Sequence, residues 1–356
     1  MIGPMSSKIR RRPPGAPTLS AIAEAAGVAL PTVSKVLNGR SDVSDSTRLR
    51  VTQMLRQGGY ELDDDVDGRS DHPQDAAGGL VDLVAPGIEG SWATSMLAGV
   101  EEVVSRAGRD VVVTLARETG PGEASWADRL VARGCRGAVL ALVTPTRAQR
   151  RLLAAANVEL VMLDPGAEPV TDLATVGATN WSGGYSATEY LVSLGHRRIG
   201  IIGGLPIHLY SKARLDGYRS ALSAAGIAWN PDLVREADWT RAGAFDAATD
   251  LLAQAQPPTA IFACSDRMAL GVYEAAASVG LSIPGQLSVV GFDDLPEARW
   301  LSPALTTVRQ PVREMGRTAA TMLLRLLNGE ELETQRLELA TVLMPRASAT
   351  PPDLGQ

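Results

Sequence analysis

Short, continuously apolar runs alternate with amphipathic helical stretches from residue 80 onwards, and this alternation constrains the fold more than any other feature of the sequence. Strands without polar alternation are typical of a parallel sheet buried on both faces, and the intervening stretches supply the helices that cover it. The pattern continues for about 270 residues, which exceeds one sheet of usual size, so we predict a two-lobed parallel α/β body. The predicted strands are residues 80–85, 110–115, 137–142, 160–163, 199–203, 260–263 and 287–291, and the predicted helices are 93–107, 148–156, 183–194, 214–225, 242–255, 267–279 and 315–327.

Charge is distributed unevenly along the 356 residues. The first 60 residues hold nine Lys or Arg and three Asp or Glu, a balance of +6; the whole chain carries −6, which leaves −12 for the rest. A basic head on an acidic body indicates that the head meets a polyanion while the body has another task. A solvated N-terminal tail would give the same balance, so charge alone leaves both interpretations open.

Composition divides the chain into five zones. Residues 1–17 are rich in Arg and Pro and are predicted to be a disordered basic arm. Residues 18–62 carry compact helical patterning, whereas residues 63–78 hold six aspartates and have the composition of a hinge or linker. Residues 79–347 form the predicted two-lobed body, and residues 348–356 are a short tail.

The head contains the pattern of three short helices. Thr18 can cap a helix over residues 19–26, which Gly27 ends, and a second helix follows over residues 30–37. Ser44 can cap the third helix, and two short helices joined by a tight Gly turn and backed by a third describe a helix-turn-helix. The second helix directs small groups and one cation outwards, as contacts with base edges and phosphates require. These outward residues are Leu30, Pro31, Thr32, Ser34 and Lys35.

The head closely resembles the DNA-binding headpiece of the LacI/GalR-type regulators, the lactose-repressor family. The resemblance is carried by Thr18-Leu19, Ile22-Ala23, Ala26-Gly27-Val28, Thr32-Val33-Ser34-Lys35-Val36-Leu37-Asn38-Gly39, Val43-Ser44, Thr47-Arg48, Val51 and Gly59-Tyr60. A three-helix packing module without DNA would have similar apolar spacing but no reason to carry the outward polar face. The DNA-contacting positions that the resemblance implies are Thr18, Leu19, Leu30, Pro31, Thr32, Ser34, Lys35, Asn38, Arg48 and Arg69.

The head also departs from that family. Ala29 stands where a Ser usually caps the recognition helix, a loss of about 1 kcal/mol unless Pro31 offsets it. In the family the hinge becomes a helix on DNA and wedges a Leu into the minor groove, but here that position is Arg69 and aspartates precede it. Carboxylates beside phosphates are repelled. We therefore hypothesise that the hinge lies off the DNA, or that Arg69 enters a narrow minor groove in place of a wedge.

The body resembles the periplasmic sugar-binding-protein fold that these regulators use as their effector-binding and dimerisation domain. The resemblance runs from about residue 80 to residue 346 and includes Val176-Gly177, Leu194-Gly195-His196-Arg197-Arg198-Ile199-Gly200, Cys264-Ser265-Asp266-Arg267-Met268-Ala269-Leu270-Gly271, Ser288-Val289-Val290-Gly291-Phe292-Asp293-Asp294 and Leu305-Thr306-Thr307-Val308-Arg309-Gln310. The ligand contacts that it implies are Trp92, Asp164, Tyr210, Arg214, Trp239, Ser265, Asp293 and Gln310.

The position of these residues at strand ends agrees with the resemblance. Asp164, Ser265 and Asp293 each follow a predicted strand, and ligands of open parallel sheets bind beyond the carboxyl ends of strands. Structural alternatives remain open: Asp164 could be a turn residue, Trp92 could pack in a lobe core, and Arg214 could form a surface ion pair. Ser265 stands where sugar-responsive relatives often have an amide, and Asp294 is interpreted as structural.

No catalytic motif is present: the sequence has no G-x-S-x-G elbow, no HExxH and no Walker A run. Two cysteines and three histidines argue against a disulfide scaffold or a zinc site. We therefore predict neither an enzyme nor a metal or cofactor site. The N-terminus has no secretory apolar region, and no apolar run reaches bilayer-spanning length, so we expect a cytoplasmic, nucleoid-associated protein.

The resulting prediction is a sequence-specific transcriptional regulator, expected to be a repressor, whose operator affinity is controlled by a small carbohydrate held between the lobes. We expect a homodimer on a palindromic double-stranded operator. The alternatives are a cytoplasmic sugar sensor that acts through a protein partner and, less favoured, a sugar-modifying enzyme. The ligand's identity and whether it releases or recruits the protein are left open.

Overall fold

The computed structural model describes residues 9–11, 17–37, 43–57, 61–62, 79–117, 120, 123–167 and 173–353. Its internal contacts divide the chain into two units, Met1–Gly79 and Leu80–Gln356, which are described separately below. Among the described residues, no single helix has the length and apolar composition to cross a membrane; the bent pair Leu19–Ala25 and Leu30–Leu37 passes such a test only jointly, by length and composition.

The head unit is built from three helices, as the sequence predicts. They are α1 (Leu19–Ala25), α2 (Leu30–Leu37) and α3 (Asp45–Gln57). The Thr18 hydroxyl caps α1 by accepting a hydrogen bond from the Ala21 N–H at 3.3 Å, and Gly27 follows the helix with a φ of +63°. The shared core consists of Ile22, Ala23, Ala26, Val33, Val36, Leu37, Val43, Val51 and Leu55.

One expectation for the head is wrong. Residues 9–11 were expected to belong to a disordered arm, but they form strand β1 (Ile9–Arg11), which pairs antiparallel with β2 (Glu61–Leu62). The strand β2 that pairs with β1 lies some fifty residues further along the chain, so the composition of residues 1–17 could not predict this pairing. The remainder of the predicted arm to residue 16, the hinge of residues 63–78, and Asn38 and Arg69 lie outside the described residues.

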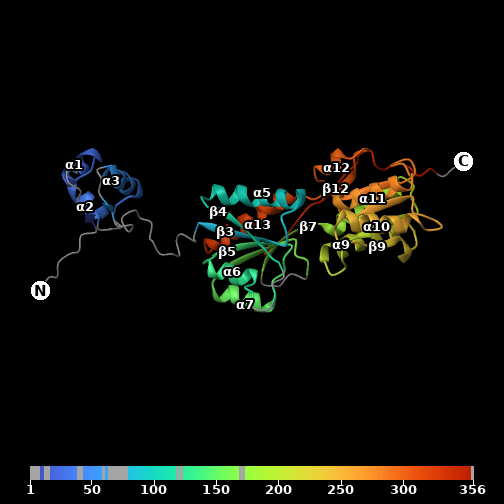
Figure 1. Cartoon of the computed structure of the whole chain (residues 1–356), viewed down its shortest axis with the longest axis horizontal. Coiled ribbons are helices and arrows are strands. Elements are labelled where there is room, and N and C mark those ends of the chain that lie inside the picture. Colours follow the sequence, from blue (N-terminus) through green and yellow to red (C-terminus); the bar gives the residue numbers. More distant parts are fainter. Residues whose placement is uncertain are drawn as a thin grey trace. The chain divides into compact units, whose positions relative to one another are not determined.

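The N lobe of the body is an all-parallel six-stranded sheet in the order β13-β7-β6-β5-β3-β4. Helices α5 and α13 pack on one face over Met96, Val100, Met315 and Leu323, and α6 and α7 cover the other over Leu130 and Leu153 (Figure 1). The elements are β3 (Leu80–Ala85), β4 (Asp110–Leu115), β5 (Gly137–Ala141), β6 (Glu159–Leu163), β7 (Ala174–Ala178), β13 (Arg336–Leu339), α5 (Gly90–Arg106), α6 (Trp126–Ala132), α7 (Arg147–Ala155) and α13 (Val312–Leu327).

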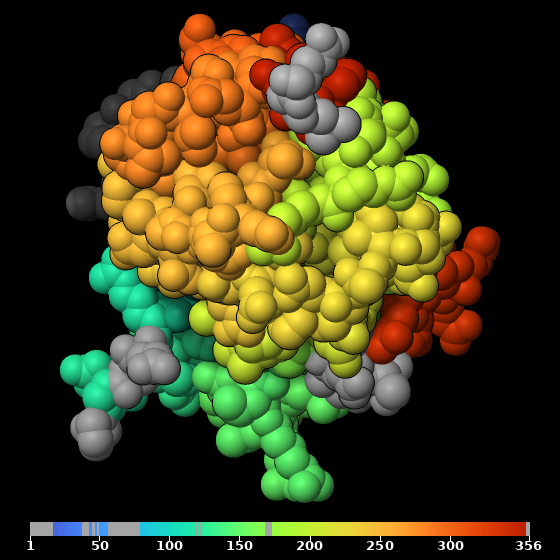
Figure 2. Space-filling view, turned by 90° about the vertical axis from the view of Figure 1, so that its right-hand side faces the viewer, coloured from blue at the N-terminus to red at the C-terminus, as the bar shows by residue number. Residues whose placement is uncertain are grey.

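The C lobe repeats this architecture with the order β14-β12-β11-β10-β8-β9, in which only the β12–β14 pair is antiparallel. Helices α8 and α9 pack together, as do α10 and α11. Figure 2 shows the outer surface of this lobe. The elements are β8 (Ile199–Gly203), β9 (Val234–Glu236), β10 (Ala260–Ala263), β11 (Ser288–Asp293), β12 (Thr306–Arg309), β14 (Val342–Met344), α8 (Asn180–Ser193), α9 (Leu209–Ala224), α10 (Arg241–Leu252), α11 (Asp266–Ser278), α12 (Glu297–Trp300) and a 3-10 turn at Pro231–Leu233.

The chain crosses between the lobes three times: from β7 to α8, from β12 to α13, and from β13 to β14. The first and third crossings are joined, because the Thr341 N–H donates to Thr179 Oγ1 at 2.9 Å and the Thr179 N–H donates to the Leu339 carbonyl at 3.0 Å. The second crossing carries Gln310, whose N–H donates to the Asp293 carbonyl at 3.2 Å. The fold class predicted from the sequence, a helix-turn-helix head followed by a two-lobed parallel α/β body, is confirmed.

Candidate functional site

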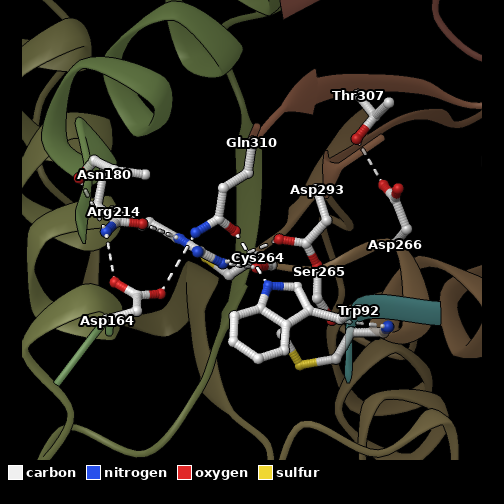
Figure 3. A network of polar contacts seen from close by, with 12 residues as sticks. Trp92, Asp164, Asn180, Arg214, Cys264, Ser265, Asp266, Asp293, Thr307 and Gln310 are labelled. Carbon is white, nitrogen blue, oxygen red and sulfur yellow. Dashed lines mark hydrogen bonds and ion pairs between the residues drawn. The ribbon is translucent and has the colours of Figure 1, made fainter. Parts of the chain in front are cut away.

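The carboxyl ends of three central strands meet at the junction of the two lobes. Asp164 follows β6 of the N lobe, whereas Ser265 follows β10 and Asp293 ends β11 in the C lobe (Figure 3). Both aspartates have a positive φ, +47° at Asp164 and +113° at Asp293, and both are more than nine-tenths buried. Strained, buried carboxylates at strand ends are typical of binding sites rather than of a lobe core.

Arg214 of α9 is the central cation of this junction, and only 3% of the residue is exposed. Its Nε donates to Asn180 Oδ1 at 2.9 Å, its Nη1 donates to the Cys264 carbonyl, and the guanidinium lies 3.7 Å from the centre of the Phe292 ring. Nη1 also lies 3.9 Å from Asp293 Oδ1. The alternative of a surface ion pair is therefore wrong for Arg214.

Two glycines set the position of Arg214 by allowing α8 and α9 to approach closely. A Cβ on Gly184 would lie 2.3 Å from the Arg214 carbonyl oxygen, and one on Gly217 would lie 2.2 Å from the Trp181 carbonyl oxygen. Neither distance is compatible with any side chain unless the helices separate. The close approach of α8 and α9 that these glycines allow therefore places the Arg214 guanidinium inside the junction.

A chain of long hydrogen bonds links the N lobe to the crossings. Gln310 Nε2 donates to Asp164 Oδ2 at 3.3 Å, Trp92 Nε1 donates to Gln310 Oε1 at 3.4 Å, and Asn180 Nδ2 donates to Asp164 Oδ1 at 3.5 Å (Figure 3). Trp92 also packs against the N-lobe core, so it combines the two roles considered from the sequence. Burial raises the pKa of Asp164, and the nearby Arg214 charge opposes that rise.

Three aromatic rings form one wall beside Arg214. His208 stacks on Tyr210 with ring centres 5.0 Å apart, and Tyr210 and Trp239 are 5.3 Å apart. Trp239 Nε1 donates to His208 Nδ1 at 3.2 Å, and burial lowers the pKa of His208, which favours the neutral ring that this hydrogen bond requires. The rings of Tyr210 and Trp239 are tilted by 56° to each other, so the wall offers two apolar ring faces next to a cation and two carboxylates.

The C-lobe carboxylates have different partners. Burial raises the pKa of Asp293 to about 7, with Arg214 opposing the rise. Burial also raises the pKa of Asp266 well above its usual range, and its carboxylate accepts hydrogen bonds from the Leu295 N–H and the Thr307 hydroxyl. Asp294 accepts from Arg309 Nε at 2.8 Å and from Arg346, which agrees with its interpretation as structural.

Ser265 stabilises the start of α11, because its hydroxyl accepts a hydrogen bond from the Met268 N–H at 3.1 Å. The structure therefore brings together all eight residues chosen from the sequence. It adds Asn180, which bridges Asp164 and Arg214, and His208, which orients the aromatic wall. The bridging role of Asn180 depends on partners 16 and 34 residues away in the sequence, so no local pattern indicates it.

On the head, α2 presents an exposed face opposite its buried one. Leu30 is 45% exposed, and Pro31, Ser34 and Lys35 are exposed as well, with Thr32 half-buried beside them. Thr18 is exposed, whereas Leu19 packs partly against the head core. The side chain of Arg48 lies outside the described residues, as do Asn38 and Arg69.

The described residues contain no group of three or more His, Cys, Asp or Glu side chains arranged to hold a metal ion. Cys135 and Cys264 are both buried and unpaired as disulfides, and burial raises the pKa of each thiol to about 12. Neither thiol therefore carries the thiolate character that a nucleophile requires.

Comparison with known proteins gives two family matches. Residues 18–62 match the family "Bacterial regulatory proteins, lacI family", and residues 188–349 match "Periplasmic binding protein-like domain". The ribose operon repressor of Haemophilus influenzae is 32% identical over 344 residues, covering 92% of this chain and 97% of the relative. The solved structure of a CelR–cellobiose complex superimposes with a TM-score of 0.69 at 32% identity, over 93% of this chain and 99% of that one. A lac repressor dimer bound to operator superimposes with a TM-score of 0.73 at 27% identity, over 94% and 99%.

Proposed function

This chain belongs to the lacI family of bacterial regulatory proteins, and we propose that it is a repressor whose operator affinity is controlled by a small carbohydrate held between the two lobes of its body. The relatives are named as transcriptional repressors and regulators rather than as enzymes. The observation that carries the ligand proposal is the buried Arg214 between Asp164 and Asp293, placed beside the aromatic wall of Tyr210 and Trp239.

The chemistry of that site suits a sugar. Carboxylates accept hydrogen bonds from adjacent hydroxyl groups, and an indole or phenol ring packs against the C–H face of a sugar ring. The Ser265 hydroxyl accepts the capping bond of α11 with one lone pair, and its O–H can still donate to a ligand. The relatives support this class, since one is named a ribose operon repressor and another was solved with cellobiose.

Ligand binding and lobe geometry are coupled in the proposed mechanism. The site takes Trp92 and Asp164 from the N lobe, Arg214 and Asp293 from the C lobe, and Gln310 from a crossing between them. A ligand that contacts residues of both lobes stabilises one arrangement of the lobes over others. By reciprocity, operator DNA then changes ligand affinity by the same factor, typically about 5–150-fold.

For the head, we propose that α2 reads a half-site in the major groove and that a homodimer reads a palindromic operator. The exposed Leu30, Pro31 and Ser34, with Thr32, would set sequence preference, while Lys35 and the basic residues of the arm and α3 would attract phosphate. The likeness to a lac repressor dimer bound to operator supports this assignment. That Arg69 enters a narrow minor groove, or that the acidic hinge lies off the DNA, stays a hypothesis.

The competing candidate is a sugar sensor that acts through a protein partner. The observation that favours it is the run of aspartates at 63–65 and 67, directly after the head, which phosphates would repel. The two candidates differ in one measurable property, since only a DNA-binding regulator shows specific duplex binding that weakens steeply with salt.

The deciding experiment is a pull-down of genomic fragments with purified full-length protein at physiological salt, followed by sequencing. We expect a few fragments that share a palindrome. Thr32→Ala combined with Ser34→Ala should remove this enrichment while leaving nonspecific binding nearly unchanged. Enrichment of no fragment, with and without sugars drawn from the relatives, would favour the sensor.

A separate test addresses the ligand site. Asp293→Ala should abolish the sugar response of the enriched fragments and leave their binding in the absence of sugar near normal. Loss of DNA binding in this variant would instead mark Asp293 as a purely structural residue.

A further inference from the structure

The two strand-end carboxylates at the junction of the lobes receive few short hydrogen bonds from the described residues. Arg214 Nε and Nη1 donate to Asn180 and to the Cys264 carbonyl rather than to either carboxylate. Asp293 accepts no side-chain hydrogen bond from the described part of the chain and has only the 3.9 Å ion pair with Arg214. From the described residues, the Asp164 carboxylate accepts only long hydrogen bonds, of 3.3 and 3.5 Å. These oxygens can therefore accept hydrogen bonds from the hydroxyl groups of a bound ligand.

Glu297 adds a further acceptor that the sequence did not suggest. It begins the short helix α12 of the C lobe, and its Oε1 accepts a 2.6 Å hydrogen bond from the Ser91 hydroxyl of N-lobe helix α5. Its other oxygen, Oε2, is buried and has no partner among the described residues. The carboxylate is close enough to Asp293 for its charge to contribute to the raised pKa of that residue. Glu297 thus touches the opposite lobe through one oxygen and leaves the other without a donor.

The charges of the site are also unbalanced. Asp164 and Asp293 both lie near the Arg214 guanidinium, and the charge of Glu297 acts on Asp293, so the described residues of this site include three carboxyl groups and one guanidinium. A phosphate ester or a carboxylate would bring further negative charge and no donor, in surroundings where water screens poorly. A neutral polyhydroxyl compound brings donors and no charge.

Resting on the proposed function, we propose that this cleft selects uncharged, hydroxyl-rich ligands and rejects phosphorylated or carboxylated ones, with Asp293 and Glu297 as the excluding residues. Glu297 then belongs to the binding surface, although it is absent from the set of residues implied by the family resemblance. The proposal separates an unmodified sugar from its phosphate ester, a distinction that fold and family do not make.

The test uses inorganic phosphate and ribose 5-phosphate as anionic probes and ribose as the neutral one, titrated calorimetrically into the full-length protein without DNA. We expect no saturable phosphate or ribose 5-phosphate site in the body of the wild-type protein. The double variant Asp293→Asn, Glu297→Gln keeps the shapes and removes the charges. It should bind ribose 5-phosphate at least about tenfold more tightly than the wild type does.

Two controls separate the cleft from the basic head. Adding Arg214→Gln to the double variant should remove the gain, and Glu101→Gln, on the exposed surface of α5, should produce none. The proposal is overturned if the wild type binds ribose 5-phosphate more tightly than ribose, or if the double variant gains nothing. Since no step involves DNA, failure of these titrations is distinguishable from failure of the regulator proposal, which the fragment pull-down decides.

Discussion

The charge on Asp293 should make the body less stable at neutral pH than an uncharged side chain would. The carboxyl is more than nine-tenths buried, and burial raises its pKa from the ordinary 3.8 to about 7. Between those two pH values the folded protein holds a proton on Asp293 that the unfolded chain has released. Stability attributable to this group is therefore complete below pH 3.8 and is lost as pH rises through 7.

The size of the effect follows from the same shift. Each pH unit over which the proton is held only by the folded state changes the free energy of unfolding by about 1.4 kcal/mol. Over about three units, the ionised Asp293 costs on the order of 4 kcal/mol. Asparagine has nearly the same shape, tolerates a positive φ and carries no charge, so Asp293→Asn should stabilise the body at pH 8 by up to about 4 kcal/mol.

The assay is urea unfolding followed by tryptophan fluorescence at several pH values. All six tryptophans lie between residues 92 and 300, so the signal reports the body and not the head. The difference in unfolding free energy between variant and wild type should be near zero at pH 4 and reach its plateau above pH 7. Asp294→Asn is the matched control and should destabilise, because Asp294 pairs with Arg309 and Arg346.

Parallel pH profiles for wild type and Asp293→Asn would refute the reasoning. They would mean that Asp293 stays ionised in the folded protein without cost, which its burial and its long 3.9 Å ion pair argue against. A variant that is more stable but no longer responds to sugar would show that the site gives up stability for binding.

Three further substitutions test other parts of the structure. Gly184→Ala should destabilise the body by about 1–3 kcal/mol and weaken sugar binding, because its Cβ would meet the Arg214 carbonyl; unchanged unfolding and binding would contradict the packing argument. Thr18→Ala should lower head stability by about 1 kcal/mol through loss of the α1 cap, as measured by thermal melting monitored by circular dichroism. Trp300→Glu should shift the proposed homodimer towards monomer in analytical ultracentrifugation, because this 76% exposed indole of the C lobe offers the apolar area that an interface buries; an unchanged sedimentation coefficient would exclude Trp300 from the interface.

The sequence did not predict the interior strand β7. It predicted the innermost strands of both sheets, β5, β6, β10 and β11, because they are buried on both faces and largely apolar. Strand β12 escaped prediction for the opposite reason, since Thr306 and Thr307 are fully buried polar residues. Their hydroxyls are satisfied by Arg346 and Asp266, which lie about forty residues away. Strand β13 was missed because its residues are largely exposed at a sheet edge, where composition carries little strand signal.

The site divides in the same way. Asp164, Arg214 and Asp293 could be chosen because strand ends and family positions coincide at them. Glu297 could not, since it lies in a four-residue helix without periodicity and its partner Ser91 is 206 residues distant in the sequence. The Glu297 carboxylate finds its partner in the other lobe, so its role depends on the folded junction and cannot be read from the sequence around it.

The strengths of the contacts at the junction indicate where a ligand acts. Arg214 is fixed within the C lobe and the first crossing by a 2.9 Å bond to Asn180 and by stacking on Phe292. Apart from the 2.6 Å bond between Ser91 and Glu297, the N-lobe contacts of the site are longer, since the bonds from Gln310 to Asp164 and from Trp92 to Gln310 measure 3.3 and 3.4 Å. A ligand that replaces the 3.3 Å bond to Asp164 with a short one to the same carboxylate, in one lobe arrangement only, gains about 1–3 kcal/mol. That range matches the coupling energy typical of allosteric control, so the long bonds of the N lobe are the contacts through which sugar and operator would influence each other.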